Sequence, residues 1–410
     1  MNILWGTIVL GIFSQQVISY FLLVKKFRDF FNPILFTFIF IYFPFCISHL
    51  KLSAYQTIEY HPYFYIIMLV SSTLILYYSF FARPQKVKVS YELKVDNRLL
   101  IIVALNIVYV LSYFYENVYL SGSIIPLTVI DEVGDVHLNG LPIVREFNTV
   151  FRVLLPLLNY YLFWKTKKKR YLLLSVLSLC IPLSRGSRSA VINSIIIITV
   201  FSLRKINFKK ILITMTTVIV GLQIAMYLGD YRRSYTNNSY GYEVGIVSDW
   251  LNTTVIGKII SWYYGYYALS LYNFNTSLLK WLNDQVFFLG LTNLNGLLSY
   301  FVNSYPTQSE FNSRIENING AANVPTALYY YLIDFGVLGI FIIDFFVYTL
   351  LFFVYKRSMY DSFYRLCYCY LLLHILTFAF YSSFYAVLFY PLMILVLLFK
   401  KFFHKGIVLR

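Results

Sequence analysis

Long apolar runs separated by short clusters of lysine and arginine are the feature that most constrains this chain. The first run extends from Ile3 to Val24 and is followed by Lys25 and Lys26, and the same alternation recurs along the sequence. A helix needs about 20 apolar residues to cross a bilayer, and these runs reach that length. Hydrophobic residues make up 59% of the chain and charged residues 13%, which is too little polar surface for a soluble globule. We therefore predict an all-α, polytopic integral membrane protein, with residues 1–410 as a single transmembrane domain.

The basic clusters also predict how the chain is oriented in the membrane. Lysine and arginine are retained preferentially on the cytoplasmic side, and placing every cluster there puts the N-terminus outside and the C-terminus inside. The net charge of +16 is spread over these clusters rather than gathered in one patch, so it indicates contact with anionic lipid and not with nucleic acid. The resulting topology has about eleven spans, at about 3–24, 33–50, 62–82, 99–120, 149–164, two within 171–203, 211–229, 335–355, 363–382 and 384–399.

Two outer loops of unequal length separate these spans. The smaller covers residues 121–148, and the larger covers residues 230–325. Within the larger loop, Val255–Leu271 and Leu278–Leu298 mix apolar and aromatic residues with Asn, Ser and Lys. Such segments are too interrupted to cross a membrane and are typical of amphipathic helices. We expect them to lie on the membrane surface or over a cavity.

The run from Tyr171 to Leu203 is too long for a single span. As a helix it would measure roughly 50 Å, against about 30 Å of bilayer hydrocarbon, and basic clusters lie on both sides of it. The chain must therefore cross and return, with the turn at Ser184–Arg188, SRGSR. This turn places Arg185 and Arg188 at the outer face, against the usual bias. An anion-binding role at the start of the returning helix would explain them, and capping of the hairpin with contact to lipid headgroups is the alternative.

Taken together, the outer stretches hold more arginine than lysine. Guanidinium binds phosphate oxygens in pairs and stays charged when partly desolvated, so the outer face has the composition of a phosphate-binding surface. Arg232 and Arg233 are either a second anion clamp or a lipid anchor. Arg314 has Glu310 and Glu316 as neighbours, and an anionic substrate would compete with them. The outer arginines are Arg145, Arg152, Arg185, Arg188, Arg232, Arg233 and Arg314.

If this outer face catalyses a group transfer to a hydroxyl, it also needs a proton acceptor there. Sequence spacing does not choose among the candidates, and each of them is also explained as a solvated surface group. The candidates are Asp131, Glu132, Asp135, His137, Glu146, Glu243, Asp249, Glu310, Glu316 and Asp334.

Four further ionisable residues lie within or at the ends of spans. Asp344 and His374 fall near the middle of two of them, where ionisable groups are costly and usually paired. We expect them to contact each other in a structural role, with a proton path as the alternative. His49 and Glu116 lie near the outer ends of their spans and are expected to face a cavity.

Metal and nucleotide cofactors are not expected. The cysteines Cys46, Cys180, Cys367 and Cys369 all lie within apolar runs and predict neither a disulfide framework nor a metal site. The sequence also lacks a D-x-D metal motif.

Three features together resemble a known family. They are the LSRGSRSA turn between two spans, the long outer loop between late spans, and the segment Asn323–Gly339, NVPTALYYYLIDFGVLG. The last resembles an aromatic helix followed by a G-x-x-G start to the next span. On these features the chain resembles the Wzy-type O-antigen polymerases, also called oligosaccharide repeat unit polymerases.

The resemblance implies a GT-C-like integral membrane glycosyltransferase in the bacterial inner membrane, with its active site facing the periplasm. Such an enzyme moves a growing glycan from undecaprenyl pyrophosphate onto the next lipid-linked repeat unit. The expected partners are this lipid-linked oligosaccharide, membrane lipid and a polysaccharide chain-length regulator. Arg185 matches the family's pyrophosphate-binding arginine, and Arg188 is expected to assist it. The expected substrate-binding residues are Arg232, Arg233, Arg314, Glu310 and Asp334.

Two other functions were weighed. A flippase or other transporter of lipid-linked oligosaccharides should show an internal repeat, and none is evident. An O-antigen ligase should carry a His-Asn pair where this chain has Pro325 and Thr326. That difference argues against a ligase and leaves the proton acceptor unassigned. The sugars, the linkage and the control of chain length stay open.

Overall fold

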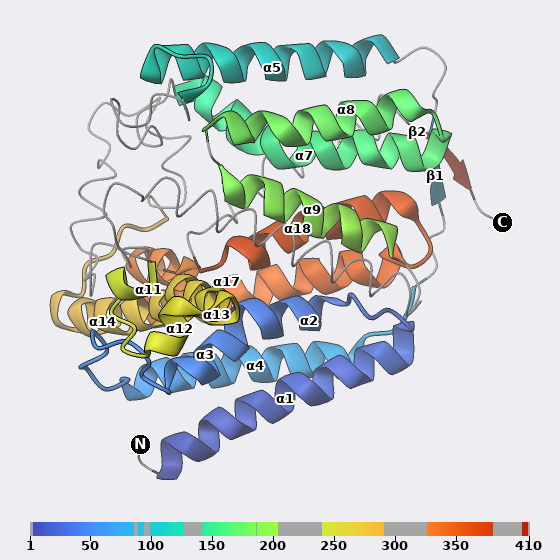
Figure 1. Cartoon of the computed structure of the whole chain (residues 1–410). Helices are drawn as coiled ribbons and strands as arrows, with labels where there is room; N and C mark the ends of the chain where they lie inside the picture. The colour runs from blue at the N-terminus through green and yellow to red at the C-terminus, as the bar shows by residue number, and fades with distance from the viewer. Residues whose placement is uncertain are drawn as a thin grey trace. The chain divides into compact units, whose positions relative to one another are not determined.

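The computed structural model describes residues 3–85, 89–93, 99–126, 142–185, 187–203, 240–290, 326–379 and 404–408. Its secondary structure is helical apart from one antiparallel strand pair, β1 (Val89–Leu93) with β2 (His404–Val408) (Figure 1). The predicted all-α class is thus confirmed, with this small sheet as an addition. The chain forms two compact units: unit 1 is Met1–Pro84, Arg233–Lys356 and Leu371–Tyr385, and unit 2 is Gln85–Arg232, Arg357–Tyr370 and Ala386–Arg410.

Four helices in the described ranges are long and apolar enough to cross a membrane. This is the pattern of a multi-pass helical membrane protein. The four are α1 (Ile3–Phe27), α4 (Pro62–Phe81), α5 (Leu99–Ser121) and α17 (Ala327–Ser358).

In unit 1, α1 packs along α4 through polar as well as apolar contacts. Gln16 Nε2 donates to Ser72 Oγ at 2.9 Å, and Lys26 Nζ donates to the Ser79 carbonyl at 2.9 Å. A hydrogen bond between buried side chains fixes the register of two apolar helices, because leaving either group unpaired would be costly.

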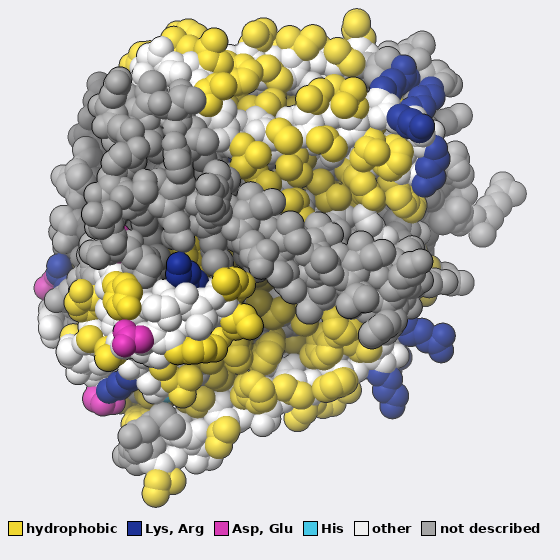
Figure 2. Space-filling model, in the orientation of Figure 1, with side chains coloured by type: hydrophobic (Ala, Val, Ile, Leu, Met, Phe, Trp, Pro, Cys, Tyr) yellow, Lys and Arg dark blue, Asp and Glu magenta, His cyan; other side chains and the backbone are white. Residues whose placement is uncertain are grey.

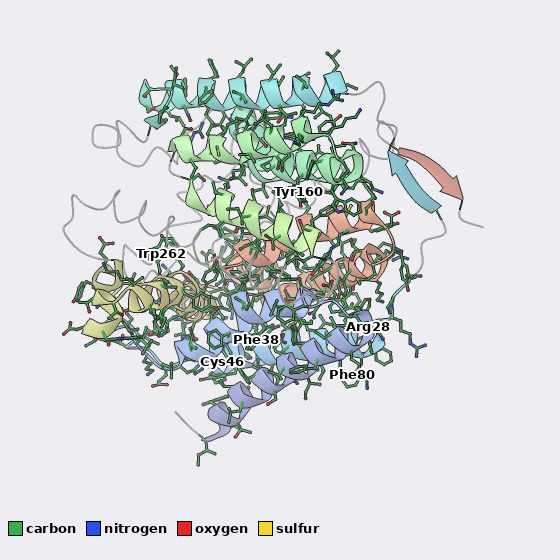
Figure 3. All side chains as sticks on the ribbon, turned by 45° about the vertical axis from the view of Figure 1, so that its right-hand side comes forward. Arg28, Phe38, Cys46, Phe80, Tyr160 and Trp262 are labelled. Carbon is green, nitrogen blue, oxygen red and sulfur yellow. The ribbon has the colours of Figure 1, made fainter. Side chains whose placement is uncertain are left out.

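The second apolar run is a broken helix. It consists of α2 (Pro33–Thr37), the π-helix η1 (Phe38–Tyr42) and α3 (Phe43–Ser48). Pro44 has no N–H to donate to the preceding turn, and the wider π turn occurs just before it. Phe38 lies in this turn and packs edge-to-face on Phe13, with ring centroids 5.4 Å apart (Figure 3).

The segment after residue 240 differs from its prediction as surface helices. After α11 (Tyr240–Glu243) and α12 (Asp249–Thr253), α13 (Val255–Tyr263), the π-helix η5 (Tyr264–Ala268) and α14 (Leu269–Asp284) follow one another without a gap. Apolar side chains of α13 are exposed, as predicted. Residues 269–271 and Leu278, at the ends of the two predicted amphipathic segments, are instead buried, which does not fit a location on the membrane surface.

Polar side chains of α14 explain why this helix is buried. Tyr272 Oη donates to the Ile58 carbonyl at 3.0 Å. Asn275 accepts from the His61 N–H at 2.8 Å and donates to the Glu59 carbonyl at 3.2 Å. These side chains form hydrogen bonds with main-chain groups of the loop between α3 and α4, which apolar side chains could not do.

Helix α17 is interrupted at Gly336. Its φ of 69° and ψ of −168° lie outside the helical region and suit glycine. The carbonyls of Ile333 and Asp334 lose their helical partners and accept instead from the N–H groups of Phe288 and Leu289, at 2.8 and 3.0 Å. The aromatic segment is thus helical, and the interruption lies at Gly336, the first glycine of the predicted G-x-x-G start to the next span.

Replacing Gly336 by alanine should destabilise the protein. A Cβ there would lie 3.0 Å from Phe287 and 3.3 Å from Trp281, and the positive φ adds about 1–2 kcal/mol of backbone strain. We expect a fall of several degrees in the unfolding temperature of the purified protein. The matched variant Gly11→Ala, in α1 with no atom within 4 Å of the added methyl, should leave that temperature unchanged or slightly raised. Equal effects of the two substitutions would contradict this account.

In unit 2, the predicted hairpin between residues 171 and 203 is present. α7 (Pro142–Thr166) is followed by α8 (Lys169–Cys180), the 3-10 helix η3 (Ile181–Arg185) and α9 (Arg188–Ser202), and the chain reverses between α8 and α9 (Figure 1). Ser202 Oγ donates to Tyr160 Oη of α7 at 2.8 Å. The helix after the turn begins at Arg188, as predicted.

A buried arginine closes the other end of α9. Arg365, on α18 (Ser362–Thr377), is 1% exposed and its Nη2 donates to the carbonyls of Val200 and Leu203, at 2.6 and 3.1 Å. These carbonyls are among those that a helix C-terminus leaves unpaired, and a cation is favoured there. Within unit 2, other basic side chains gather where α7 meets α8 (Figure 2).

Candidate functional site

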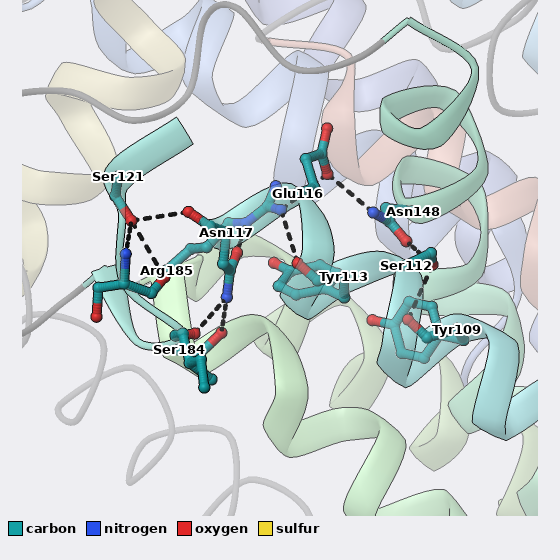
Figure 4. Close-up of polar contacts among 11 residues, drawn as sticks. Tyr109, Ser112, Tyr113, Glu116, Asn117, Ser121, Asn148, Ser184 and Arg185 are labelled. Atoms are coloured by element: carbon teal, nitrogen blue, oxygen red, sulfur yellow. Dashed lines mark hydrogen bonds and ion pairs between the residues drawn. The ribbon is translucent and has the colours of Figure 1, made fainter. Parts of the chain in front are cut away.

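Arg185 is held by three groups of α5. It is the last residue of η3, and its side chain, 11% exposed, lies against the end of α5 (Figure 4). Nη2 donates to Glu116 Oε2 at 2.8 Å and to the Tyr113 carbonyl at 3.1 Å, and Nε donates to Asn117 Oδ1. The guanidinium also lies over the Tyr113 ring, 4.2 Å from its centroid. Arg185 therefore points into the protein and not at lipid.

Glu116 is the counter-charge, and it is fully buried. Its Oε2 accepts from Arg185 and also from Asn148 Nδ2, at 2.8 Å, while Oε1 is buried without a hydrogen-bond partner among the described residues. This oxygen is the part of the carboxylate that no described donor contacts. The prediction that Glu116 faces a cavity stays a prediction.

A second row of residues orients this ion pair. Asn117 Nδ2 donates to Ser184 Oγ at 3.1 Å and to the Ile124 carbonyl at 2.8 Å, which fixes the amide oxygen toward Arg185. Ser112 Oγ donates to Asn148 Oδ1 at 2.7 Å, which turns that amide nitrogen toward Glu116. The arginine is thus preorganised before any ligand arrives.

A second arginine lies close to this cluster. Arg152 follows Asn148 by one turn of α7, and both Arg152 and Arg185 act electrostatically on the hydroxyls of Tyr109 and Tyr113. Counted over the described side chains, two guanidinium groups against one carboxylate give the cluster a net positive charge. Such a site favours an anion with several oxygens, phosphate above all.

The remaining predicted site residues are not brought into this cluster. Arg188 starts α9, but its side chain lies outside the described residues, as do Arg232, Arg233, Arg314 and Glu310. Asp334 belongs to unit 1, where it is fully buried beside the break at Gly336. Their predicted roles stay predictions.

The proton-acceptor candidates are only partly within the described residues. Asp249 accepts from Tyr242 Oη at 3.3 Å on an exposed surface, which fits the solvated interpretation. The side chains outside the description are Asp131, Glu132, Asp135, His137, Glu146, Glu310 and Glu316.

The predicted Asp344–His374 pair is wrong, because the two residues have other partners. Asp344 accepts a hydrogen bond from Ser71 of α4, and His374 Nε2 lies 3.4 Å from Tyr331 Oη. His49 is packed among aromatic rings, with Tyr65 Oη at 3.1 Å and the Tyr60 ring stacked at 4.5 Å.

Sequence reasoning missed the residues around Arg185 and Glu116. Tyr109, Tyr113 and Asn117 recur every fourth residue on α5, and Asn148 and Arg152 are four apart on α7. Polar residues at this spacing lie on one face of a helix, so the signal was present.

Comparison with protein-family models, curated protein sequences and solved structures finds no match.

The Arg185–Glu116 pair should couple strongly in a double-mutant cycle. Glu116→Gln leaves a largely buried guanidinium without its counter-charge, which typically costs about 3–5 kcal/mol, and Arg185→Gln leaves a buried carboxylate. We expect the double variant to be more stable than the sum of the two single losses predicts, measured by denaturant unfolding.

An exposed ion pair of unit 1 provides the control. Lys51 Nζ and Glu59 Oε1 are 2.7 Å apart, with side chains 39% and 79% exposed. The lysine lowers the pKa of the Glu59 carboxyl, yet the pair should couple by less than about 1 kcal/mol because water screens it. Similar coupling in both cycles would contradict the importance assigned to Arg185 and Glu116.

Proposed function

We propose that this protein is a repeat unit polymerase that extends a bacterial surface polysaccharide at the periplasmic face of the inner membrane. Arg185 would hold the pyrophosphate of an undecaprenyl-linked donor, as the resemblance of the SRGSR turn implies. The observation that carries this proposal is the fixed Arg185 guanidinium, which uses Nε and Nη2 for protein contacts and has no described acceptor at Nη1. That edge is left for a phosphate oxygen.

Breaking a glycosidic bond to pyrophosphate puts negative charge on the leaving group. A guanidinium already oriented by Glu116 and Asn117 stabilises this charge without having to reorganise. The acceptor sugar would approach from the outer side, and the loop 230–325 would cover it. The group that takes its proton remains to be assigned.

The proposal includes the topology of about eleven spans with the N-terminus outside and the C-terminus inside. Contacts within each unit support it, because they join segments that this topology assigns to one side. Lys26 contacts the end of α4, Tyr355 Oη donates to Asp29 at 3.4 Å, and Arg365 caps the end of α9, all on the inner side. β1 and β2 also fall on one side.

Cysteine labelling tests this topology. With the exposed Cys180 replaced by serine, a membrane-impermeant maleimide should label Ile124→Cys in intact cells. It should label Lys168→Cys, in the connection between α7 and α8, only after permeabilisation. The reverse pattern would place Arg185 on the cytoplasmic side and remove the basis of the proposal.

The functional test is complementation of a polymerase-deficient strain. Arg185→Ala and Arg185→Lys should both give lipopolysaccharide with a single repeat unit at normal protein levels, because lysine is a point charge and cannot replace the fork of donors. Gel electrophoresis of the polysaccharide gives the result. Wild-type ladders from both variants would exclude Arg185 from the mechanism.

A lipid-linked oligosaccharide transporter is the second candidate, and one observation favours it. Asp344 is a carboxyl group buried in the apolar part of α17, beside the π-interrupted second run, and such groups often mark transport paths. The same gel separates the two functions, since a transport defect leaves no repeat unit attached at all.

A further inference from the structure

Polar side chains are paired in successive layers between α5 and α7. At the outer end, Glu116 and Ser112 are both hydrogen-bonded to Asn148. Farther along the two helices, Asn106 and Asn159 exchange two hydrogen bonds, at 3.3 and 2.9 Å. In an apolar environment each of these groups needs its partner.

The layer between them is not paired. It contains Tyr109 of α5 and Arg152 of α7. Tyr109 is fully buried, and its hydroxyl has no hydrogen-bond partner in the described part of the chain. The half-buried Arg152 guanidinium likewise makes no hydrogen bond or ion pair with any described residue, although its main-chain carbonyl accepts from Ser194 at 3.5 Å. A lone arginine at such a place is costly and indicates a missing anion.

The charge of Arg152 acts on the same two tyrosine hydroxyls as that of Arg185. Both cations therefore lie near Tyr109 and Tyr113. Arg185 shares its charge with Glu116, whereas Arg152 has no counter-charge among the described residues. The region is suited to an anion with two charged groups.

We propose that Arg152 and Tyr109 bind one phosphate of a lipid-linked diphosphate whose other phosphate is bound by Arg185. This inference rests on the proposed function and adds the second half of its donor site. The Arg152 fork would donate to phosphate oxygens, and the Tyr109 hydroxyl would donate one further hydrogen bond. A monophosphate would need Arg185 alone, so Arg152 is the residue that distinguishes a lipid-linked diphosphate from a lipid-linked monophosphate.

The experiment compares two ligands on the same lipid chain. Purified protein in nanodiscs is titrated with undecaprenyl pyrophosphate and with undecaprenyl monophosphate. Wild-type protein should prefer the diphosphate by about tenfold or more. Arg152→Gln should lose most of that preference while its monophosphate affinity stays within about twofold, which also shows that the variant is folded. Arg152→Lys should keep part of the preference for the diphosphate.

A matched arginine serves as the control. Arg170 is exposed at the start of α8, and Arg170→Gln removes the same charge without touching the cluster. It should bind both lipids like wild type. If Arg152→Gln keeps the full preference for the diphosphate, or if Arg170→Gln loses as much, Arg152 is a lipid headgroup anchor and the inference is wrong.

The outcomes also separate this inference from the proposed function. Diphosphate preference that depends on Arg152, in a protein that cannot restore polysaccharide ladders, would leave the site standing and overturn the polymerase. Restored polysaccharide ladders, together with a diphosphate preference that Arg152→Gln does not change, would support the polymerase and overturn this inference. Wild-type protein that binds both lipids equally would overturn the diphosphate site itself.

Discussion

The ion pair between Arg185 and Glu116 is the interaction on which the proposed site depends. Removing a guanidinium and a carboxylate from water costs several kcal/mol for each ion. Their mutual attraction offsets this cost, together with hydrogen bonds from Asn148 to Glu116 and from Arg185 to Asn117 and the Tyr113 carbonyl. The same requirement is met differently elsewhere. Arg365 uses carbonyls at the end of a helix, and Asp344 uses a serine hydroxyl. Among the described residues, the Tyr109 hydroxyl and the Arg152 guanidinium have no such partner, and these are the groups proposed to bind a ligand.

The features that sequence reasoning predicted are local in the chain. The turn at Ser184–Arg188 follows from the length of an apolar run and the charges inside it, and the break at Gly336 follows from a glycine after an aromatic segment. Both features depend only on residues that are close together in the sequence. The helical class follows in the same way, because only hydrogen bonds within the segment satisfy a backbone in lipid.

The features that sequence reasoning missed depend on residues far apart in the chain. The two amphipathic segments were expected on the membrane surface or over a cavity. Helix α14, which joins them, is instead buried and uses Tyr272 and Asn275 to bind the main chain of residues 58–61. Asp344 was assigned to His374 because both are ionisable, whereas a neutral serine is its partner. Arg152 was one of several outer arginines, and only the absence of a partner among the described residues distinguishes it.

The pairing of β1 with β2 has a consequence for biogenesis. Val89–Leu93 hydrogen-bonds with His404–Val408, near the last residues of the sequence, so the earlier strand cannot be completed until translation has passed residue 408. The strand pair therefore forms after the described helices that precede β2 in the chain have been made. Synthesis of His404–Val408, rather than membrane insertion of any one segment, sets the earliest time at which this strand pair can assemble.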